Sequence, residues 1–178
     1  CKNNQGYANL CQLSAKAYLE GFYYKPRTDI ELLKQYSEGI IASTACLKGE
    51  VGFNFYLNRD EQSHQAIHRL REIYGDDLYL EIQHNGIPEQ EVVNKKVISF
   101  AQESGLPLLA TNDCHYLRRE DAAAHEVLLC IQTGKLLSDQ NRMKLSTDEF
   151  YFKSPQEMRA NFKDVPEACD NSLRIAQM

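Results

Sequence analysis

Three short apolar runs, each followed by polar residues, alternate along the chain with amphipathic segments, and this alternation is the strongest constraint on its fold. The runs cover 40–44, 78–83 and 106–110 and are predicted as strands. The runs at 40–44 and 106–110 are typical of strands buried in a parallel sheet, and 78–83 is predicted as a strand because it alternates. Strands that alternate with helices favour parallel pairing through right-handed crossovers. We therefore predict an α/β fold in which helices cover a parallel sheet.

Helical spacing of apolar residues and helix-boundary residues predict the segments around these strands. Gly21 and Gly105 mark two helix ends, and the Ser154-Pro155-Gln156-Glu157 sequence is a strong helix start. Residues 149–153 are predicted as a short strand or an extended arm. In the helix after the third strand, the side expected to face inward contains Ala122, Val127, Leu128 and Ile131. Helices are predicted over 6–20, 30–36, 60–74, 88–104, 118–131, 155–162 and from 166 onward.

Length and composition narrow the class of protein. A chain of 178 residues corresponds to about one domain. Its net charge of −5 argues against a dedicated nucleic-acid-binding surface, although a small basic patch is compatible with it. Six scattered cysteines without a C-x-x-C pair favour free thiols in a reducing compartment. No apolar run approaches the roughly 20 residues of a membrane span, so no membrane partner is expected.

The two ends of the chain and its few strands suggest a piece of something larger. The sequence starts with Cys1 rather than a methionine and ends at Met178, directly after an amphipathic stretch. Three strands are few for a complete barrel of alternating strands and helices. We therefore expect that N-terminal strands of the domain are missing from this sequence.

Polar side chains that suit metal ions follow all three predicted strands. Cys46 follows the first, His84 the second, and Asp113 and His115 the third. The carboxyl ends of parallel strands share one rim, and thiolate, imidazole and carboxylate together suit zinc or a similar metal. Asp113 and His115 lie two apart, so on an extended segment both would point the same way. Taken alone, each residue also has a structural alternative: a loop cap with local packing for the Asp-x-His pair, a small buried apolar residue for Cys46, and a solvated loop residue for His84, which we favour.

Other candidate residues have simpler interpretations. His64 and His68 lie four apart on a helix, but residue 65 is glutamine, so the metalloprotease motif is absent and a solvated face is predicted. His125 is expected to pack or hydrogen-bond within its helix. No Gly-rich phosphate loop or Gly-x-Ser-x-Gly elbow occurs. An aromatic cluster is interpreted first as packing and then as an interface; its members are Tyr7, Tyr18, Tyr23 and Tyr24. Four basic residues are interpreted as solvated unless they touch phosphate or acidic neighbours; they are Lys25, Arg27, Arg118 and Arg119.

Several segments together resemble one family, the PHP (polymerase and histidinol phosphatase) domain as it occurs in bacterial DNA polymerase III alpha subunits. They include YLEGFYYKPR, STACLKGE and ATNDCHYLRREDAAAHEVLLCIQTGK, and the likeness runs in order along essentially the whole chain. The segments are 18–27, 43–50, 85–90, 110–135 and 150–158.

The resemblance implies a distorted, TIM-like β/α barrel with a metal cluster at one rim, of which residues 1–178 are the C-terminal portion. Cys46 falls on the family's cysteine ligand, and Asp113 and His115 fall on its final Asp-x-His pair. The family's opening His-x-His and its other ligands precede this stretch and are absent, and His84 has no family role that we can assign. Some members have lost their ligands, so the three retained here imply the type that binds divalent zinc, manganese or magnesium.

The resemblance also implies a function for the parent protein, a cytoplasmic DNA-directed DNA polymerase that binds DNA, nucleotides and other replisome subunits. Its PHP domain would provide metal-dependent 3′–5′ exonuclease or pyrophosphate hydrolysis, or would stabilise the polymerase and bind its partners. We expect the segment alone to be inactive. Two alternatives remain: a free-standing PHP-type phosphoesterase, which should lack YLEGFYYKPR and LLCIQTGK, and a non-catalytic scaffold module. The parent reading frame discriminates, since a polymerase continues for several hundred residues more.

Overall fold

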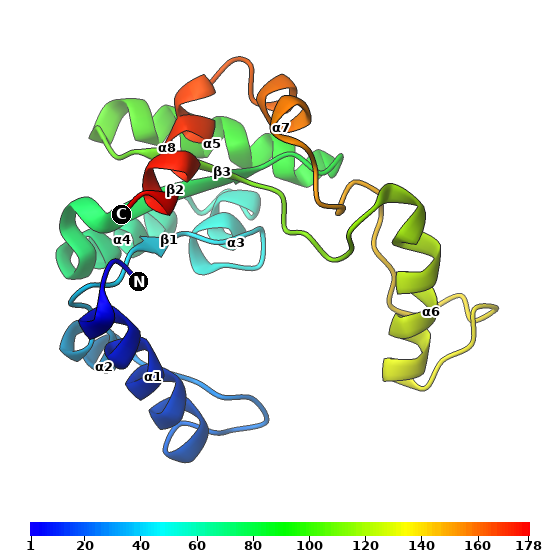
Figure 1. Ribbon diagram of the computed structural model, residues 1–178, viewed down its shortest axis with the longest axis horizontal. Helices are drawn as coiled ribbons and strands as arrows, with labels where there is room; N and C mark the ends of the chain where they lie inside the picture. Colours follow the sequence, from blue (N-terminus) through cyan, green and yellow to red (C-terminus); the bar gives the residue numbers. More distant parts are fainter.

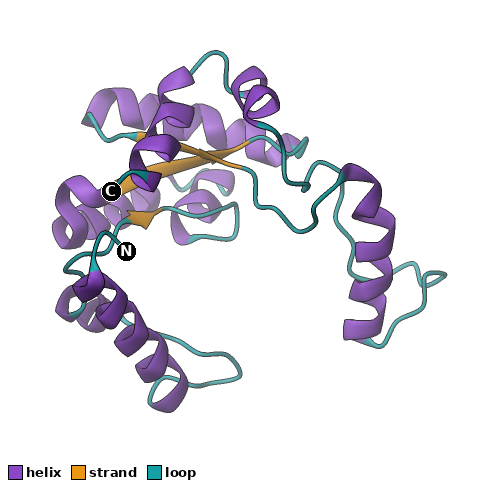
Figure 2. Ribbon diagram, in the orientation of Figure 1, coloured by secondary structure: helices purple, strands orange, loops and turns teal.

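A three-stranded parallel sheet forms the centre of the computed structural model, which describes all 178 residues. The strands β1 (Ala42–Ser43), β2 (Leu78–Gln83) and β3 (Leu108–Thr111) lie side by side in that order. Ala42 pairs with Leu78 across the first pair, and Leu80 with Leu108 across the second. Helices occupy both connections between these strands (Figures 1 and 2). The predicted α/β architecture with parallel strands is confirmed.

Eight α-helices surround or extend from the sheet, and seven of them match predicted segments. The exception is α3, which the sequence did not reveal because it is short, contains Gly52 and has Gly49 as an N-cap without a side-chain hydrogen bond. Two short 3-10 helices, Gly75–Asp77 and Arg119–Asp121, precede β2 and α6. The helices are α1 (Asn4–Leu19), α2 (Ile30–Gln35), α3 (Glu50–Tyr56), α4 (Asp60–Tyr74), α5 (Pro88–Ser104), α6 (Ala122–Thr133), α7 (Pro155–Asn161) and α8 (Pro166–Ala176).

The two faces of the sheet differ in chemistry. Leu80 and Ile82 of β2 belong to the hydrophobic core, with Val51 of α3 and Val97 of α5. Since side chains alternate along a strand, Glu81 of β2 lies on the opposite face. One face therefore packs against helices through apolar side chains. The other face carries polar side chains such as that of Glu81.

Two parts of the chain project from this body, which comprises the sheet with α3, α4, α5, α7 and α8. One projection holds α1 and α2, and it is tied to the body by an ion pair of 2.5 Å between Lys2 and Asp77. The other consists of 117–148, which includes α6 and is called the α6 unit below. Figure 1 shows the two projections on opposite sides of the molecule. None of the helices combines the length and apolar character that crossing a membrane requires.

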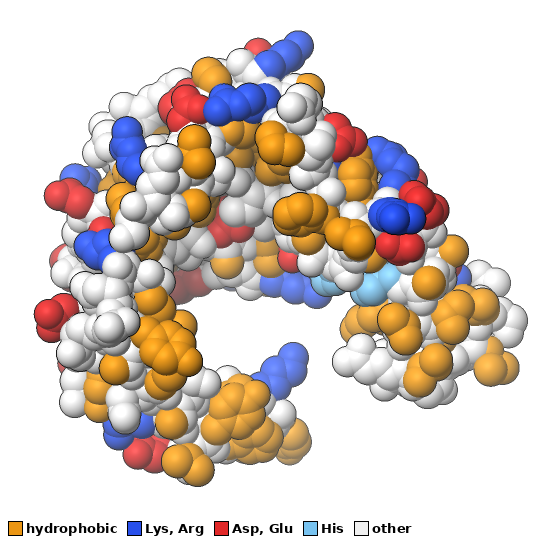
Figure 3. Space-filling model, viewed as in Figure 1, with side chains coloured by type: hydrophobic (Ala, Val, Ile, Leu, Met, Phe, Trp, Pro, Cys, Tyr) orange, Lys and Arg blue, Asp and Glu red, His pale blue; other side chains and the backbone are white.

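The packing predicted for α6 is wrong. Val127, Leu128 and Ile131 were expected inside, but they are 42%, 61% and 72% exposed, and only Cys130 of this helix is buried. Figure 3 shows apolar side chains gathered on the surface of this unit. Periodicity located the apolar residues of the helix, but it carries no information on whether another element of the same chain covers them.

The prediction for His64 is also wrong. Its ring lies 4.5 Å from that of Phe100 in α5 and edge-on to Phe55 in α3 at 5.8 Å, as centroid distances. The residue is therefore half-buried between α3 and α5. His68, one turn further on, is exposed as predicted. All six cysteines are free thiols, also as predicted.

Candidate functional site

The Asp-x-His pair lies in the loop that leaves the carboxyl end of β3. His115 Nε2 is 3.5 Å from Asp113 Oδ1, and the two side chains are 37% and 41% exposed. The extended conformation predicted for this segment is wrong, because Asp113 has φ +51°. Aspartate occupies this left-handed region more readily than most residues because its short side chain can hydrogen-bond locally. The loop nevertheless brings the carboxylate and the imidazole together.

His125 of α6 also lies beside this pair. Its ring centroid is 5.4 Å from that of His115, while Phe150 contacts the other histidine edge-on at 5.5 Å. His125 was predicted to pack or hydrogen-bond within its helix, and its position beside His115 was not predicted. The signal available was proximity along the chain, since α6 begins only a few residues after His115.

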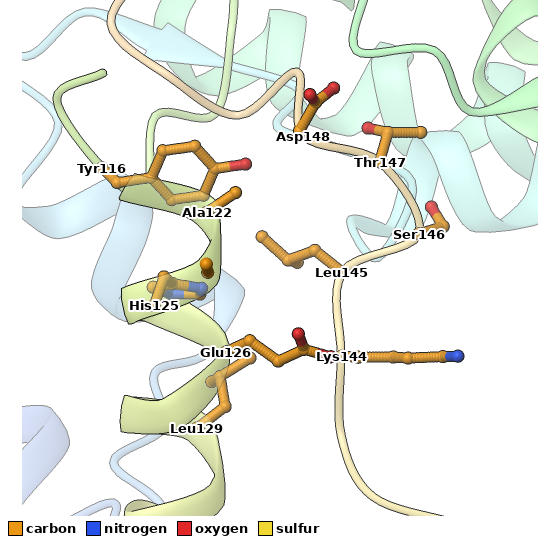
Figure 4. A pocket seen from close by; sticks show the side chains of 11 residues that line it. Tyr116, Ala122, His125, Glu126, Leu129, Lys144, Leu145, Ser146, Thr147 and Asp148 are labelled. Atoms are coloured by element: carbon orange, nitrogen blue, oxygen red, sulfur yellow. The ribbon is translucent and has the colours of Figure 1, made fainter. Parts of the chain in front are cut away.

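A cavity of about 360 Å³ separates α6 from the segment that returns toward the body. Figure 4 shows His125 and Glu126 on the helix side and Leu145 pointing toward them from the returning segment, while Lys144 points away from the helix. A polar histidine and a carboxylate therefore line this space together with apolar groups. Glu126 is itself paired with Arg142 at 2.5 Å.

Cys46 lies in the turn between β1 and α3, and it is half-buried. Its backbone carbonyl accepts a hydrogen bond of 2.9 Å from the Gly49 amide, which closes the turn. Because the strands are parallel, this turn is at the same edge of the sheet as the Asp113 loop. However, no three His, Cys, Asp or Glu side chains of the chain come together closely enough to hold a metal ion. The structure thus brings together Asp113 and His115 but does not add Cys46 to them.

His84 follows β2 at this edge and makes contacts that the solvated-loop prediction did not include. Its Nε2 is 3.4 Å from Glu91 Oε1 of α5, and its ring lies edge-on to Phe162 at 6.3 Å. The side chain is still 41% exposed. The prediction is therefore correct in exposure and incomplete in contacts.

Glu81 forms a polar cluster across all three strands that was not predicted from the sequence. Its carboxylate accepts hydrogen bonds from Ser43 Oγ of β1 at 2.5 Å and from Thr111 Oγ1 of β3 at 2.5 Å. Gln83 Nε2 donates a third at 3.1 Å. An acidic residue inside an otherwise apolar strand was the available signal. Both oxygens are occupied, so Glu81 acts here as a tie between strands.

The segment 149–153 runs beside the Asp113 loop as an extended arm, one of the two predicted alternatives. Tyr116 and Tyr151 form a parallel bridge, and the His115 amide donates to the Phe150 carbonyl at 2.8 Å. Burial raises the pKa of the Tyr116 hydroxyl. The arm therefore fixes the backbone immediately after the Asp-x-His pair.

Ion pairs and hydrogen bonds also order the outer side of this arm. Arg119 pairs with Asp148 at 3.1 Å and Glu149 at 2.5 Å, which confirms the acidic-neighbour alternative for this arginine. Hydrogen bonds from the Tyr151 hydroxyl and from Ser154 lower the pKa of Glu157 to about 2. This chemistry organises the arm and α7, and it leaves the Asp113 and His115 side chains accessible.

Comparisons with known proteins identify the relatives of this chain. A family model described as the PHP domain matches residues 1–85. DNA polymerase III subunit alpha of Borreliella burgdorferi is 46% identical over 176 residues, which is 99% of this chain and 15% of that protein. The Helicobacter pylori subunit is 46% identical over 98% of this chain, and the Thermus aquaticus subunit 44% over 99%. The chain spans about 15% of the length of these relatives.

The family match includes β1 and β2, and the similarity to the polymerase subunits continues through β3, the Asp-x-His loop and the helices after it. A sequence identity of 46% across 99% of the chain reflects common ancestry. The chain is therefore a segment homologous to the PHP region of DNA polymerase III alpha subunits.

Proposed function

We propose that this chain is part of the alpha subunit of a bacterial DNA polymerase III. The observation that carries the proposal is 46% identity over 99% of the chain to such a subunit. The whole protein would then be a DNA-directed DNA polymerase, a nucleotidyltransferase of the cytoplasm. Its partners would be DNA, nucleotides and other replisome subunits.

We further propose that residues 1–178 form one portion of a PHP domain, although the family match ends at residue 85. The support is the sheet itself. β3 lies after that limit, yet it pairs with β2 at four positions, and Leu108 belongs to the same core cluster as Leu80. A domain that ended after β2 would divide this core. The parallel strands would be part of a distorted β/α barrel.

Within this portion, Asp113, His115 and Cys46 are the proposed metal ligands. Carboxylate, imidazole and thiolate fit a divalent ion such as zinc. Asp113 Oδ1 and His115 Nε2 already lie 3.5 Å apart. A bound ion of this kind lowers the pKa of a coordinated water and neutralises charge on a phosphoryl group. The chain's own contribution is to hold the carboxylate and the imidazole at one accessible point, with the thiol after β1 on the same edge of the sheet. This supports 3′–5′ exonuclease or pyrophosphate hydrolysis as the reaction of the intact domain.

The segment alone is expected to bind metal weakly and to be inactive on DNA. Two adjacent donors are fewer than the three or four protein ligands that zinc sites usually have. Calorimetric titration of the 178-residue chain with Zn²⁺ and Mn²⁺ measures this affinity. A stoichiometric site of nanomolar affinity would contradict the expectation.

An Asp113→Ala variant of the full-length protein tests the metal role. We expect weaker Zn²⁺ binding, loss of exonuclease activity on a mismatched 3′ end and retained polymerase activity. The matched control is Asp76→Ala, at another exposed aspartate that lies outside the proposed site. If metal content and exonuclease activity are the same in both variants and the wild type, the domain serves as a scaffold. A reading frame that ends soon after Met178 would instead favour a free-standing phosphoesterase.

A further inference from the structure

One buried asparagine ties the start of the Asp113 loop to the extended arm. Asn112 is 5% exposed, and its Nδ2 donates to the Glu149 carbonyl at 3.0 Å and to the Tyr151 carbonyl at 2.7 Å. Its Oδ1 accepts from Lys153 Nζ at 3.0 Å. Both amide hydrogens and the amide oxygen are therefore used. A residue directly before Asp113 is thus bound to three points on the arm.

The lysine in this arrangement is unusually buried. The Lys153 side chain is only 2% exposed, and its ammonium lies 3.1 Å from Glu149 Oε2 and 4.5 Å from the centre of the Tyr151 ring. It also donates to the Glu149 backbone carbonyl. A cation is stable in such surroundings only when it is paired and hydrogen-bonded. This position therefore favours a cation, because an apolar residue would leave Asn112 Oδ1 without its donor and Glu149 with Arg119 as its remaining cationic partner.

A second set of bonds fixes the other side of Asp113. The His115 amide donates to the Phe150 carbonyl at 2.8 Å, and the Phe152 amide donates to the Tyr116 carbonyl at 3.1 Å. The backbone is therefore held at residue 112 and again at 115–116. Between these points Asp113 has φ +51°, while its side chain stays accessible.

We propose that Asn112 and Lys153 are positioning residues for the Asp113–His115 pair. They hold the loop in the conformation that presents the carboxylate beside the imidazole, and neither touches the metal. The inference rests on the proposed metal role of that pair. Groups that orient metal ligands from behind commonly contribute about 10- to 100-fold to metal affinity.

The test compares three variants in the full-length protein, with Zn²⁺ affinity measured by calorimetry. Asn112→Ala and Lys153→Met remove the two positioning groups. Asn94→Ala is the matched control, because Asn94 is 7% exposed and donates to the Gln83 carbonyl at the end of β2. We expect all three to lower the melting temperature. Only the first two should weaken Zn²⁺ binding, by about tenfold or more, and alter the visible absorption of bound Co²⁺, which reports ligand geometry.

The outcomes separate this inference from the proposed function. If Asp113→Ala weakens Zn²⁺ binding while Asn112→Ala and Lys153→Met weaken it no more than Asn94→Ala, the positioning role is wrong and the metal role stands. If Asp113→Ala itself has no effect on Zn²⁺ binding, the proposed metal role fails as well. Should Lys153→Met not fold, the double variant with Glu149→Gln also removes the carboxylate that faces Lys153, while Arg119 keeps Asp148 as its partner. An unchanged Zn²⁺ affinity in it would equally overturn the inference.

Discussion

The body and the α6 unit use apolar side chains in opposite ways. In the body, Phe55 and Ile82 are each 1% exposed, whereas Leu128 and Ile131 in the α6 unit are 61% and 72% exposed. Full burial of such a side chain contributes about 1.5–3 kcal/mol. The body is therefore stabilised by its own core, and the α6 unit obtains little stability from its apolar residues.

Polar contacts stabilise the α6 unit, whereas apolar packing stabilises the body. Arg119 pairs with Asp148 and Glu149, Arg142 pairs with Glu126, and a cavity lies between the helix and the returning segment (Figure 4). Exposed ion pairs are worth only about 0–1 kcal/mol each. The α6 unit should therefore open locally well before the body unfolds.

The largest expected difference in the free energy of unfolding is between two side-chain truncations, one in each region. Ile82→Ala should lower the free energy of unfolding by about 2–5 kcal/mol, because it leaves a cavity in the core. Leu128→Ala should change it by less than about 0.5 kcal/mol, because the side chain is already exposed. Urea unfolding followed by circular dichroism measures both. Equal effects would show that the α6 surface is buried in solution.

Lys153→Met tests the connection between the two regions. Loss of a hydrogen-bonded buried cation should cost about 2 kcal/mol. Hydrogen exchange followed by mass spectrometry compares the variant with the wild type. The increase in exchange rate should be larger in 117–148 than in β2 and α5. Acceleration spread evenly over the chain would contradict a local connection.

A smaller effect on stability, with a larger one on association, is expected for Leu128→Ser combined with Ile131→Ser. Both positions are on the exposed side of α6, so unfolding should shift by less than about 0.5 kcal/mol per site. Exposed apolar surface of this kind promotes association, and its removal should lower scattering at high concentration. Static light scattering against the wild type measures this. Unchanged scattering would remove α6 as the source of association.

The smallest effect concerns pH and the junction of α7 with the arm. The Glu157 carboxyl has a pKa of about 2 instead of 4.5, chiefly because the Tyr151 hydroxyl donates to it. A lowered pKa in the folded state means that this contribution is complete above about pH 4.5 and is lost as pH falls toward 2. NMR titration should show the Glu157 midpoint moving upward in Tyr151→Phe. A wild-type midpoint near 4.5 would contradict the contact.

The sequence predicted the body better than the α6 unit for a physical reason. Strands and helices such as β2, α4 and α5 have strong periodicity, and their apolar sides do pack in the core. Periodicity also located the apolar side of α6, but burial depends on a partner element that a local pattern cannot reveal. The short α3 escaped detection because Gly52 and a weak N-cap obscured its start.

The candidate site was predictable in its residue types but not in its geometry. Asp113 and His115 were found from their position after an apolar strand, and the positive φ of Asp113 has no counterpart in residue spacing. The ties through Asn112 and Lys153 join residues 41 apart in the chain, beyond any local pattern. Glu81 stood out as an acidic residue within its strand, but its partners on β1 and β3 are distant in the chain and no local pattern indicates them.

The bridge between Tyr116 and Tyr151 gives the chain the topology of an inserted module. Residues on either side of the α6 unit are neighbours in space, so a short glycine linker from one to the other would bypass 117–148 without crossing the sheet. The core cluster contains no residue from the bypassed stretch. A shortened chain of this design should keep the body folded, and it would present the Asp-x-His loop without the helix beside it. The segment is thus organised so that one part can be exchanged, lengthened or removed while the sheet stays as it is.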